Sequence, residues 1–191
     1  MRRFVVGISG ASGAIYGVRL LEVLAAREDV ETHLVMSGGA ETTIRYETGR
    51  DPRDVAALAD VTHGERDLAA SLASGTFITA GMVVAPCSMR TLSGVANSAA
   101  DNLLVRAADV HLKERRPLVL VVRETPLHAG HLRLMSEATA AGAVILPPVP
   151  GFSQRPQTVA DIVDHTVGKV LDLLGIDDHE LFRRWSGLDE H

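Results

Sequence analysis

Apolar residues gather in five short runs along the chain, and each run ends in small or polar residues. The runs lie at 4–6, 32–36, 82–86, 118–122 and 143–146. Short, β-branched runs that are bounded by turn residues are typical of buried strands. Between the runs, apolar residues recur every three or four positions, as they do on one face of a helix. The alternation predicts an α/β fold, a three-layer doubly wound parallel sheet.

The same periodicity gives the expected helices and loops. Helices are predicted at about 14–27, after Ser37, and at 91–98, 102–113, 132–141 and 159–174. Gly175 follows the last of these segments, where a glycine commonly ends a helix. We expect a helix and a surface loop over 51–75, and irregular structure over 147–156, which holds four prolines.

Length and composition indicate one domain over 1–191, with 46% hydrophobic and 23% charged residues. The short tail, about 177–191, carries Trp185, which we expect to pack on a neighbouring subunit. A net charge of −5 argues against general nucleic-acid binding. No segment has the length or apolar content of a membrane span or a signal peptide. One cysteine permits no disulfide within the chain, so we expect a cytoplasmic protein.

Carboxyl ends of parallel strands meet at one edge of a sheet, where ligands bind. The first run there is followed by Gly-Ile-Ser-Gly-Ala-Ser-Gly at 7–13, whose small residues let the backbone approach a phosphate beside a helix N-terminus. The alternative is a tight turn that binds nothing. The Walker signature and the Gly-x-Ser-x-Gly elbow are absent. Ser37 stands where a dinucleotide fold has an acidic residue, which favours a mononucleotide.

The third run ends in Pro-Cys-Ser-Met-Arg-Thr at 86–91, which again offers hydroxyls, backbone donors and a cation. Cys87 is either a nucleophile or, as the absence of a paired histidine favours, a small buried side chain. Met89 either lies against a flat ring or fills the core.

Arg123 and Glu124 follow the fourth run. The arginine suits a phosphate or carbonyl oxygen and the glutamate suits proton transfer, although both could instead form ion pairs with neighbours. His128 and His131 lie three residues apart, but too few further ligands are near them in the sequence for us to predict a metal site.

Taken together, several blocks of sequence resemble the UbiX/Pad flavin prenyltransferases. They are Gly-Ile-Ser-Gly-Ala-Ser-Gly-Ala-Ile-Tyr-Gly at 7–17, Pro-Cys-Ser-Met at 86–89, Arg-Ala-Ala-Asp-Val at 106–110, Leu-Lys-Glu-Arg-Arg-Pro-Leu-Val-Leu at 112–120, Arg-Glu-Thr-Pro-Leu at 123–127 and Pro-Pro-Val-Pro-Gly-Phe at 147–152. The resemblance continues to Arg184 and Trp185 and so covers essentially the whole chain.

The resemblance implies an enzyme that binds FMN and dimethylallyl phosphate and joins the dimethylallyl group to N5 and C6 of reduced FMN. It also implies flavoprotein subunits of the Rossmann or flavodoxin type. These would form a homo-oligomer, a dodecamer, that supplies the prenylated FMN to a UbiD-type decarboxylase. Ordinary diphosphate prenyltransferases use an aspartate-rich magnesium motif, which this chain lacks, so we expect a metal-independent reaction.

The resemblance also implies roles for individual residues. Those expected to hold FMN are Gly10, Ala11, Ser12, Ser37, Ser88, Met89, Arg90, Thr91 and Arg123. Those expected to bind the prenyl phosphate are Arg106, Lys113, Ser153 and Lys169. Those expected to act in the reaction are Glu124, which moves a proton, with Ser12, Glu47, Lys113 and Trp185.

Two positions depart from the family pattern. Ser153 replaces a tyrosine whose hydroxyl contacts the prenyl phosphate, and Gly151 replaces an alanine. The shorter serine leaves open a water-bridged contact, weaker phosphate binding or a different donor. It also leaves open an FMN-binding carrier or inactive homologue. A flavin-dependent peptidyl-cysteine decarboxylase is a further alternative, although the proline-rich loop at 147–152 does not match that class.

Overall fold

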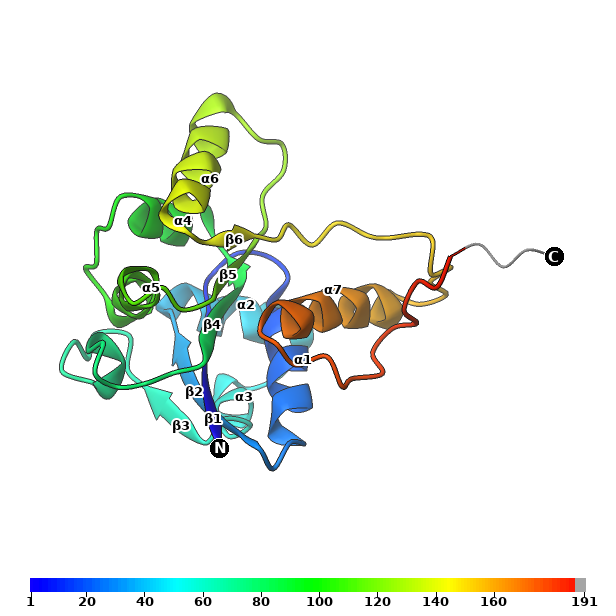
Figure 1. Cartoon of the computed structure of the whole chain (residues 1–191), viewed down its shortest axis with the longest axis horizontal. Coiled ribbons are helices and arrows are strands. Elements are labelled where there is room, and N and C mark those ends of the chain that lie inside the picture. The colour runs from blue at the N-terminus through cyan, green and yellow to red at the C-terminus, as the bar shows by residue number, and fades with distance from the viewer. Residues whose placement is uncertain (188–191) are drawn as a thin grey trace.

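The computed structural model describes residues 1–187 and contains a six-stranded sheet in the order β3-β2-β1-β4-β5-β6 (Figure 1). Every neighbouring pair of strands is parallel. The strands are β1 (Arg2–Ile8), β2 (Val30–Met36), β3 (Val61–His63), β4 (Gly81–Cys87), β5 (Leu118–Val122) and β6 (Val144–Ile145). The predicted doubly wound α/β fold is confirmed.

Helices cover both faces of the sheet. One face carries α1 (Ala14–Ala25), α2 (Gly38–Thr48), α3 (Pro52–Ala56) and α7 (Val159–Leu173). The other carries the 3-10 helix η1 (Ser71–Ala73), α4 (Met89–Ala96), α5 (Leu103–Lys113) and α6 (Ala129–Ala141).

Alternation along β1 separates the two cores. Phe4, Val6 and Ile8 belong to the core beneath α1 and α7, whereas Val5 belongs to the core beneath α4 and α5. Successive side chains of a strand point to opposite faces, so a strand that is apolar throughout requires cover on both. The continuous apolar runs of the sequence therefore reflect a three-layer structure.

The prediction for 51–75 is wrong in one respect, because this segment adds a sixth strand. β3 pairs with β2 through His33 and Val61, Leu34 and Thr62, and Val35 and His63. Val61 and Thr62 are exposed, and the strand lies at the edge of the sheet. Three residues without a buried face give no periodic signal, so the strand follows from its neighbours rather than from its own sequence.

Helix ends follow local capping chemistry. α4 begins at Met89, two residues before the prediction, because the Ser88 hydroxyl accepts a hydrogen bond from Thr91 N. α6 begins at Ala129, three residues before the prediction, because the His128 side chain caps it. α7 ends before Gly175, whose φ of 70° favours glycine, as expected.

The segment after β6 leaves the body of the protein. It runs outward from the sheet, the chain returns through α7, and the C-terminal tail then runs outward again (Figure 1). This arm, residues 146–159 and 177–187, exposes Val149, Phe152, Val159 and Trp185. The predicted tail also includes 188–191, which lie outside the described residues.

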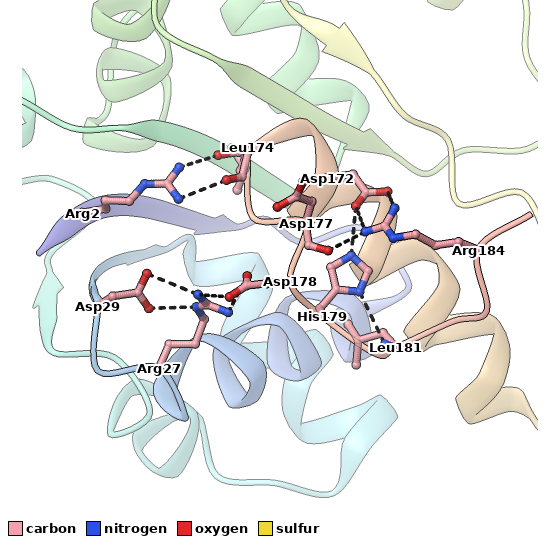
Figure 2. Close-up of polar contacts among 11 residues, drawn as sticks. Arg2, Arg27, Asp29, Asp172, Leu174, Asp177, Asp178, His179, Leu181 and Arg184 are labelled. Atoms are coloured by element: carbon pink, nitrogen blue, oxygen red, sulfur yellow. Dashed lines mark hydrogen bonds and ion pairs between the residues drawn. The ribbon is translucent and has the colours of Figure 1, made fainter.

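Ion pairs tie the start of the tail to the body (Figure 2). Asp178 pairs with Arg27, just after α1, at 2.9 Å. Asp172 of α7 accepts from Arg184 at 2.8 Å and pairs with His179 at 3.1 Å. These contacts hold Arg184 against α7, and Trp185 is the next residue along the chain.

Candidate functional site

The candidate site lies at the carboxyl ends of β1 and β4, which are neighbours in the middle of the sheet. From β1 the chain crosses toward β2, whereas β4 leads toward β5, so the loops after these two strands diverge. Ligands of open α/β sheets bind outside the carboxyl ends of the strands at such a point.

Ser9 joins these two loops. Its buried hydroxyl donates to Pro86 O at 2.8 Å and accepts from Ser88 N at 2.7 Å, and its own N–H donates to Pro86 O at 3.2 Å. The backbone that begins α4 is thereby fixed to the backbone that leads into α1.

A cleft with a volume of about 720 Å³ opens beside this junction. Five of the nine residues predicted to hold FMN line it: Gly10, Ser37, Ser88, Arg90 and Thr91. These residues come from the ends of β1, β2 and β4, as expected for the carboxyl edge of a parallel sheet.

Three helix N-termini meet at the cleft. Their capping residues Ser37, Ser88 and Asn102 all line it, at the starts of α2, α4 and α5. Helix N-termini carry partial positive charge and present unpaired N–H groups. At α4 the cap satisfies Thr91 N, which leaves the N–H groups of the first two helical residues, Met89 and Arg90, for a ligand. The arrangement suits an anion.

Glycines bring two loops into backbone contact at the cleft. A Cβ added to Gly10 would lie 3.0 Å from Gly39 Cα, and one added to Gly39 would lie 3.2 Å from Gly10 Cα. No side chain larger than hydrogen fits there without a shift of backbone. The close approach leaves the loop backbones open to a ligand.

Two guanidinium groups line the cleft without an ion-pair partner among residues 1–187, those of Arg66 and Arg90. A cavity with hydroxyls, free backbone N–H groups and unpaired guanidinium groups has the donors that a phosphate-bearing ligand needs. These residues fit the phosphate and ribityl parts of FMN.

A second group lies at the N-terminus of α1. Glu47 Oε2 accepts from Gly13 N at 2.8 Å and from Ala14 N at 3.0 Å, and Ser12 also hydrogen-bonds to this carboxylate. Partial burial favours a higher pKa for Glu47, but these hydrogen bonds and the charge of Arg123 outweigh it and hold the pKa below its ordinary value. From the sequence we expected the N–H groups of this turn to bind a phosphate. Those of Gly13 and Ala14 instead donate to the carboxylate of Glu47.

Arg123 and Glu124 follow β5 at the same edge. The Arg123 backbone N–H donates to Cys87 O at 3.2 Å, which fixes the residue beside the end of β4. Burial raises the pKa of Tyr16, and the nearby Arg123 opposes that rise, so the arginine lies close to the first turn of α1. Glu124 is exposed and accepts a hydrogen bond from Thr125 N at 3.0 Å.

Cys87 and Met89 both pack in the interior at the end of β4. Complete burial raises the pKa of the Cys87 thiol to about 12, so the sulfur stays protonated and is no nucleophile at neutral pH. Met89 is half-buried and packs against the core beneath α4 and α5. Ala11 is half-buried within the β1–α1 loop and does not line the cleft.

The residues predicted to bind the prenyl phosphate lie elsewhere in a single copy of the chain. Arg106 donates to Ala73 O at 3.2 Å and pairs with Asp109 at 2.8 Å. Lys113 pairs with Glu114 at the C-terminal end of α5, and only residues 114–117 separate it from the start of β5. It therefore lies at the amino edge of the sheet, opposite the cleft.

Ser153, Lys169 and Trp185 belong to α7 and the arm. Lys169 Nζ lies 3.7 Å from Asp172, the carboxylate that also anchors Arg184. Ser153 and Trp185 are exposed. One copy of the chain therefore brings together the predicted FMN residues of the cleft but not the predicted prenyl phosphate residues.

The sequence did not single out four residues that build the cleft, which are Ser9, Glu65, Arg66 and Asn102. The sequence could have indicated Ser9, because it lies within the glycine-rich turn at 7–13. Glu65 and Arg66 follow the unpredicted strand β3, so nothing placed them at the carboxyl edge. No group of three or more His, Cys, Asp or Glu in the described part of the chain is arranged to hold a metal ion, His128 and His131 included. Within the same residues no helix is long and apolar enough to cross a membrane.

Known proteins resemble this chain closely. It matches the Flavoprotein family model over residues 1–171. The flavin prenyltransferase UbiX of Escherichia coli strain K12 is 62% identical over 188 residues, which cover 98% of this chain and 100% of the relative.

Solved structures agree with this match. A crystal structure of AnUbiX (PadA1) in complex with FMN and dimethylallyl pyrophosphate has a TM-score of 0.94 and 52% identity, and covers 97% of this chain and 98% of its own. A dodecameric FMN-dependent UbiX-like decarboxylase from Escherichia coli O157:H7 has the same TM-score and identity, with 97% and 100% covered.

Proposed function

The chain belongs to the UbiX family of flavin prenyltransferases, and from this premise we propose that it joins the dimethylallyl group of dimethylallyl phosphate to N5 and C6 of reduced FMN. It is an enzyme that transfers a prenyl group to FMN. The observation that carries the assignment of the site is the cleft at the carboxyl edge, where capping hydroxyls, free backbone N–H groups and two unpaired guanidinium groups line one cavity.

We assign the phosphate end of FMN to the part of this cleft between α2 and α4. Ser37, Ser88 and Thr91 offer hydroxyls there, and Arg90 offers a charged donor. Arg123 lies at the neighbouring strand end and suits an oxygen of the flavin ring. Reduced FMN supplies two nucleophilic ring atoms, N5 and C6, when it is bound.

The prenyl donor loses phosphate, so the enzyme must hold a leaving anion and shelter an allylic cation from water. Lys169, Arg106 and Lys113 are the cations assigned to the anion, and the Trp185 ring face suits the cation. Glu124 would take the proton that leaves C6 as the new ring closes, and the released phosphate could share that task. Ser12 and Glu47 would orient the flavin beside the first turn of α1.

Lys113 reaches the cleft only if separate copies of the chain assemble, because it lies at the opposite edge of the sheet. A homo-oligomer, proposed to be a dodecamer, meets that requirement and would cover the exposed apolar residues of the arm. The product would pass to a UbiD-type decarboxylase. The cytoplasm stays the predicted compartment, because the only cysteine cannot form a disulfide within the chain.

The test is direct. Chemically reduced FMN and dimethylallyl phosphate are mixed anaerobically with the protein, and the flavin is analysed by mass spectrometry. We expect a flavin that carries one additional prenyl group, with dimethylallyl diphosphate run in parallel and a chelator present in duplicate samples.

The alternatives give other outcomes. Tight FMN binding with no prenylated product, while a family member works alongside, would favour the inactive carrier. Release of carbon dioxide from a cysteine-ended peptide would favour the peptidyl-cysteine decarboxylase. Activity that disappears with the chelator would contradict the metal-independent reaction.

A further inference from the structure

Glu65 connects two of the helix N-termini that meet at the cleft. Its side-chain Oε2 accepts a hydrogen bond of 3.1 Å from Gly38 N, the first residue of α2. Its backbone carbonyl accepts a hydrogen bond of 2.7 Å from Leu103 N, the first residue of α5. The side chain lines the cleft together with Ser37 and Gly39.

Glu65 places a negative charge in surroundings that are otherwise positive. The cleft receives three helix N-termini and two guanidinium groups, those of Arg66 and Arg90, all of which favour an anion. The carboxylate of Glu65 already occupies one of the backbone N–H groups there. A phosphate that enters the same end of the cleft meets both the favourable field and this fixed negative charge.

The α2 end differs from the α4 end in this respect. At α4 the N–H groups of Met89 and Arg90 lack a partner among the described residues, whereas at α2 the Gly38 N–H is held by Glu65. A dianionic phosphate placed between α2 and α4 can therefore use the α4 donors at once. It can use the Gly38 donor only after the carboxylate has moved.

We propose that Glu65 is a specificity-determining residue of the flavin site, which occupies the Gly38 N–H in the ligand-free protein and lowers the affinity for FMN relative to flavin without a phosphate. The inference rests on the proposed function, because it assumes that the cleft takes the phosphate of FMN. The negative charge of Glu65 penalises a phosphate by repulsion and by competition for the donor. Riboflavin carries no phosphate and escapes both effects.

The experiment compares FMN and riboflavin in the wild type and in Glu65→Gln. The variant keeps the shape and an acceptor oxygen but removes the charge. Affinities are measured by quenching of flavin fluorescence at neutral pH and low salt. We expect FMN to bind about two- to fivefold more tightly, the size of one exposed charge interaction, while riboflavin binding stays unchanged. The gain should shrink as salt is added.

Glu41→Gln is the matched control. Glu41 lies in the first turn of α2, pairs with Arg45 at 3.9 Å and does not line the cleft. This variant removes one negative charge near the same helix N-terminus but outside the cleft, so it should leave the ratio of FMN to riboflavin affinity at the wild-type value. If Glu65→Gln folds poorly by circular dichroism, Glu65→Ala must raise the same ratio.

An unchanged or weakened preference for FMN in the Glu65 variants would overturn the inference, as would an equal gain for both ligands or an equal gain in Glu41→Gln. Failure of the proposed flavin site has a different signature, because the wild type would then bind neither flavin, and failure of prenyl transfer alone would show in the mass of the product and leave these affinities unchanged. If the wild type binds FMN but Glu65→Gln leaves the ratio of FMN to riboflavin affinity unchanged, only the role of Glu65 is rejected.

Discussion

Ser9 holds Ser88 by a hydrogen bond of 2.7 Å between the hydroxyl oxygen of the first and the backbone N–H of the second. The contact spans the ends of β1 and β4 and is buried at Ser9. It fixes the start of α4, whose free N–H groups face the cleft. Ser9 is thus a structural residue of the site, although it presents no group to a ligand itself.

Ser9→Ala removes both hydrogen bonds of the hydroxyl and leaves Ser88 N and Pro86 O without this partner. We expect the free energy of unfolding to fall by about 1–3 kcal/mol, the usual cost of leaving buried polar groups without a hydrogen-bond partner. FMN affinity should fall with it, because the α4 N-terminus loses its anchor. Urea denaturation and fluorescence titration measure the two effects. Ser136→Ala on the exposed side of α6 should change neither.

Glu47→Gln tests the carboxylate that caps α1. The folded pKa of Glu47 lies below its ordinary 4.5, so its charge stabilises the protein above that pH and the contribution is lost as the pH falls through the folded value. We expect the variant to be less stable by about 0.5–1 kcal/mol at pH 7 and equal to wild type in stronger acid. Denaturation at a series of pH values measures this. A constant difference across that range would contradict the charge-based role, and exposed Glu28→Gln serves as control.

Glu124→Gln tests the assigned proton carrier. Its side chain is exposed beside the β5 end, so the substitution should leave the fold and FMN affinity intact. We expect product formation to slow by about 10²–10⁴-fold, the typical contribution of a general base. Anaerobic single-turnover assays measure this, with Glu137→Gln on α6 as a control that keeps wild-type turnover. Undiminished turnover in Glu124→Gln would remove the residue from the mechanism.

Lys113 and Glu124 lie at opposite edges of the sheet, so they can serve one reaction only from different copies of the chain. Lys113→Ala and Glu124→Gln should each be strongly impaired alone. Subunits mixed and reassembled from the two variants should recover part of the activity, because some sites then receive both intact residues. The same mixture without subunit exchange is the control. If verified mixed oligomers recover no activity, then either one subunit supplies both residues to each site or Lys113 does not belong to the site.

Ser153→Tyr tests the departure on the exposed arm. A tyrosine restores the longer hydroxyl of the family pattern, so we expect a lower KM for dimethylallyl phosphate. FMN affinity should not change, because Ser153 does not line the cleft. Steady-state kinetics measure the effect, and Ser153→Phe separates the hydroxyl from the ring. An equal result for both variants would deny the hydroxyl a role.

Much of the fold could be predicted because buried parallel strands leave continuous apolar runs. Each of the five runs became a strand, and the sixth strand escaped because β3 is short, exposed and held at the edge by pairing with β2. Helix starts such as Met89 were displaced by a few residues, because they depend on which side chain caps them.

The site was predictable where it depends on local sequence and not where it depends on assembly of distant segments. Gly10, Ser37 and Ser88 follow strands directly, so the carboxyl edge of the sheet brings them to one cleft. Glu65 arrives through an unpredicted strand. The N-terminal cap of α1 comes from Glu47, thirty-three residues away from Ala14, and no spacing rule reveals such a partner.

Complete burial of the only cysteine makes the protein convenient for labelling. A thiol that is both inaccessible and protonated at neutral pH should not react with maleimides. A new cysteine placed at exposed Phe152 or Ser153 would therefore carry a fluorophore alone, with Cys87 left in place. Such a probe on the arm would report subunit association directly, without any background to subtract.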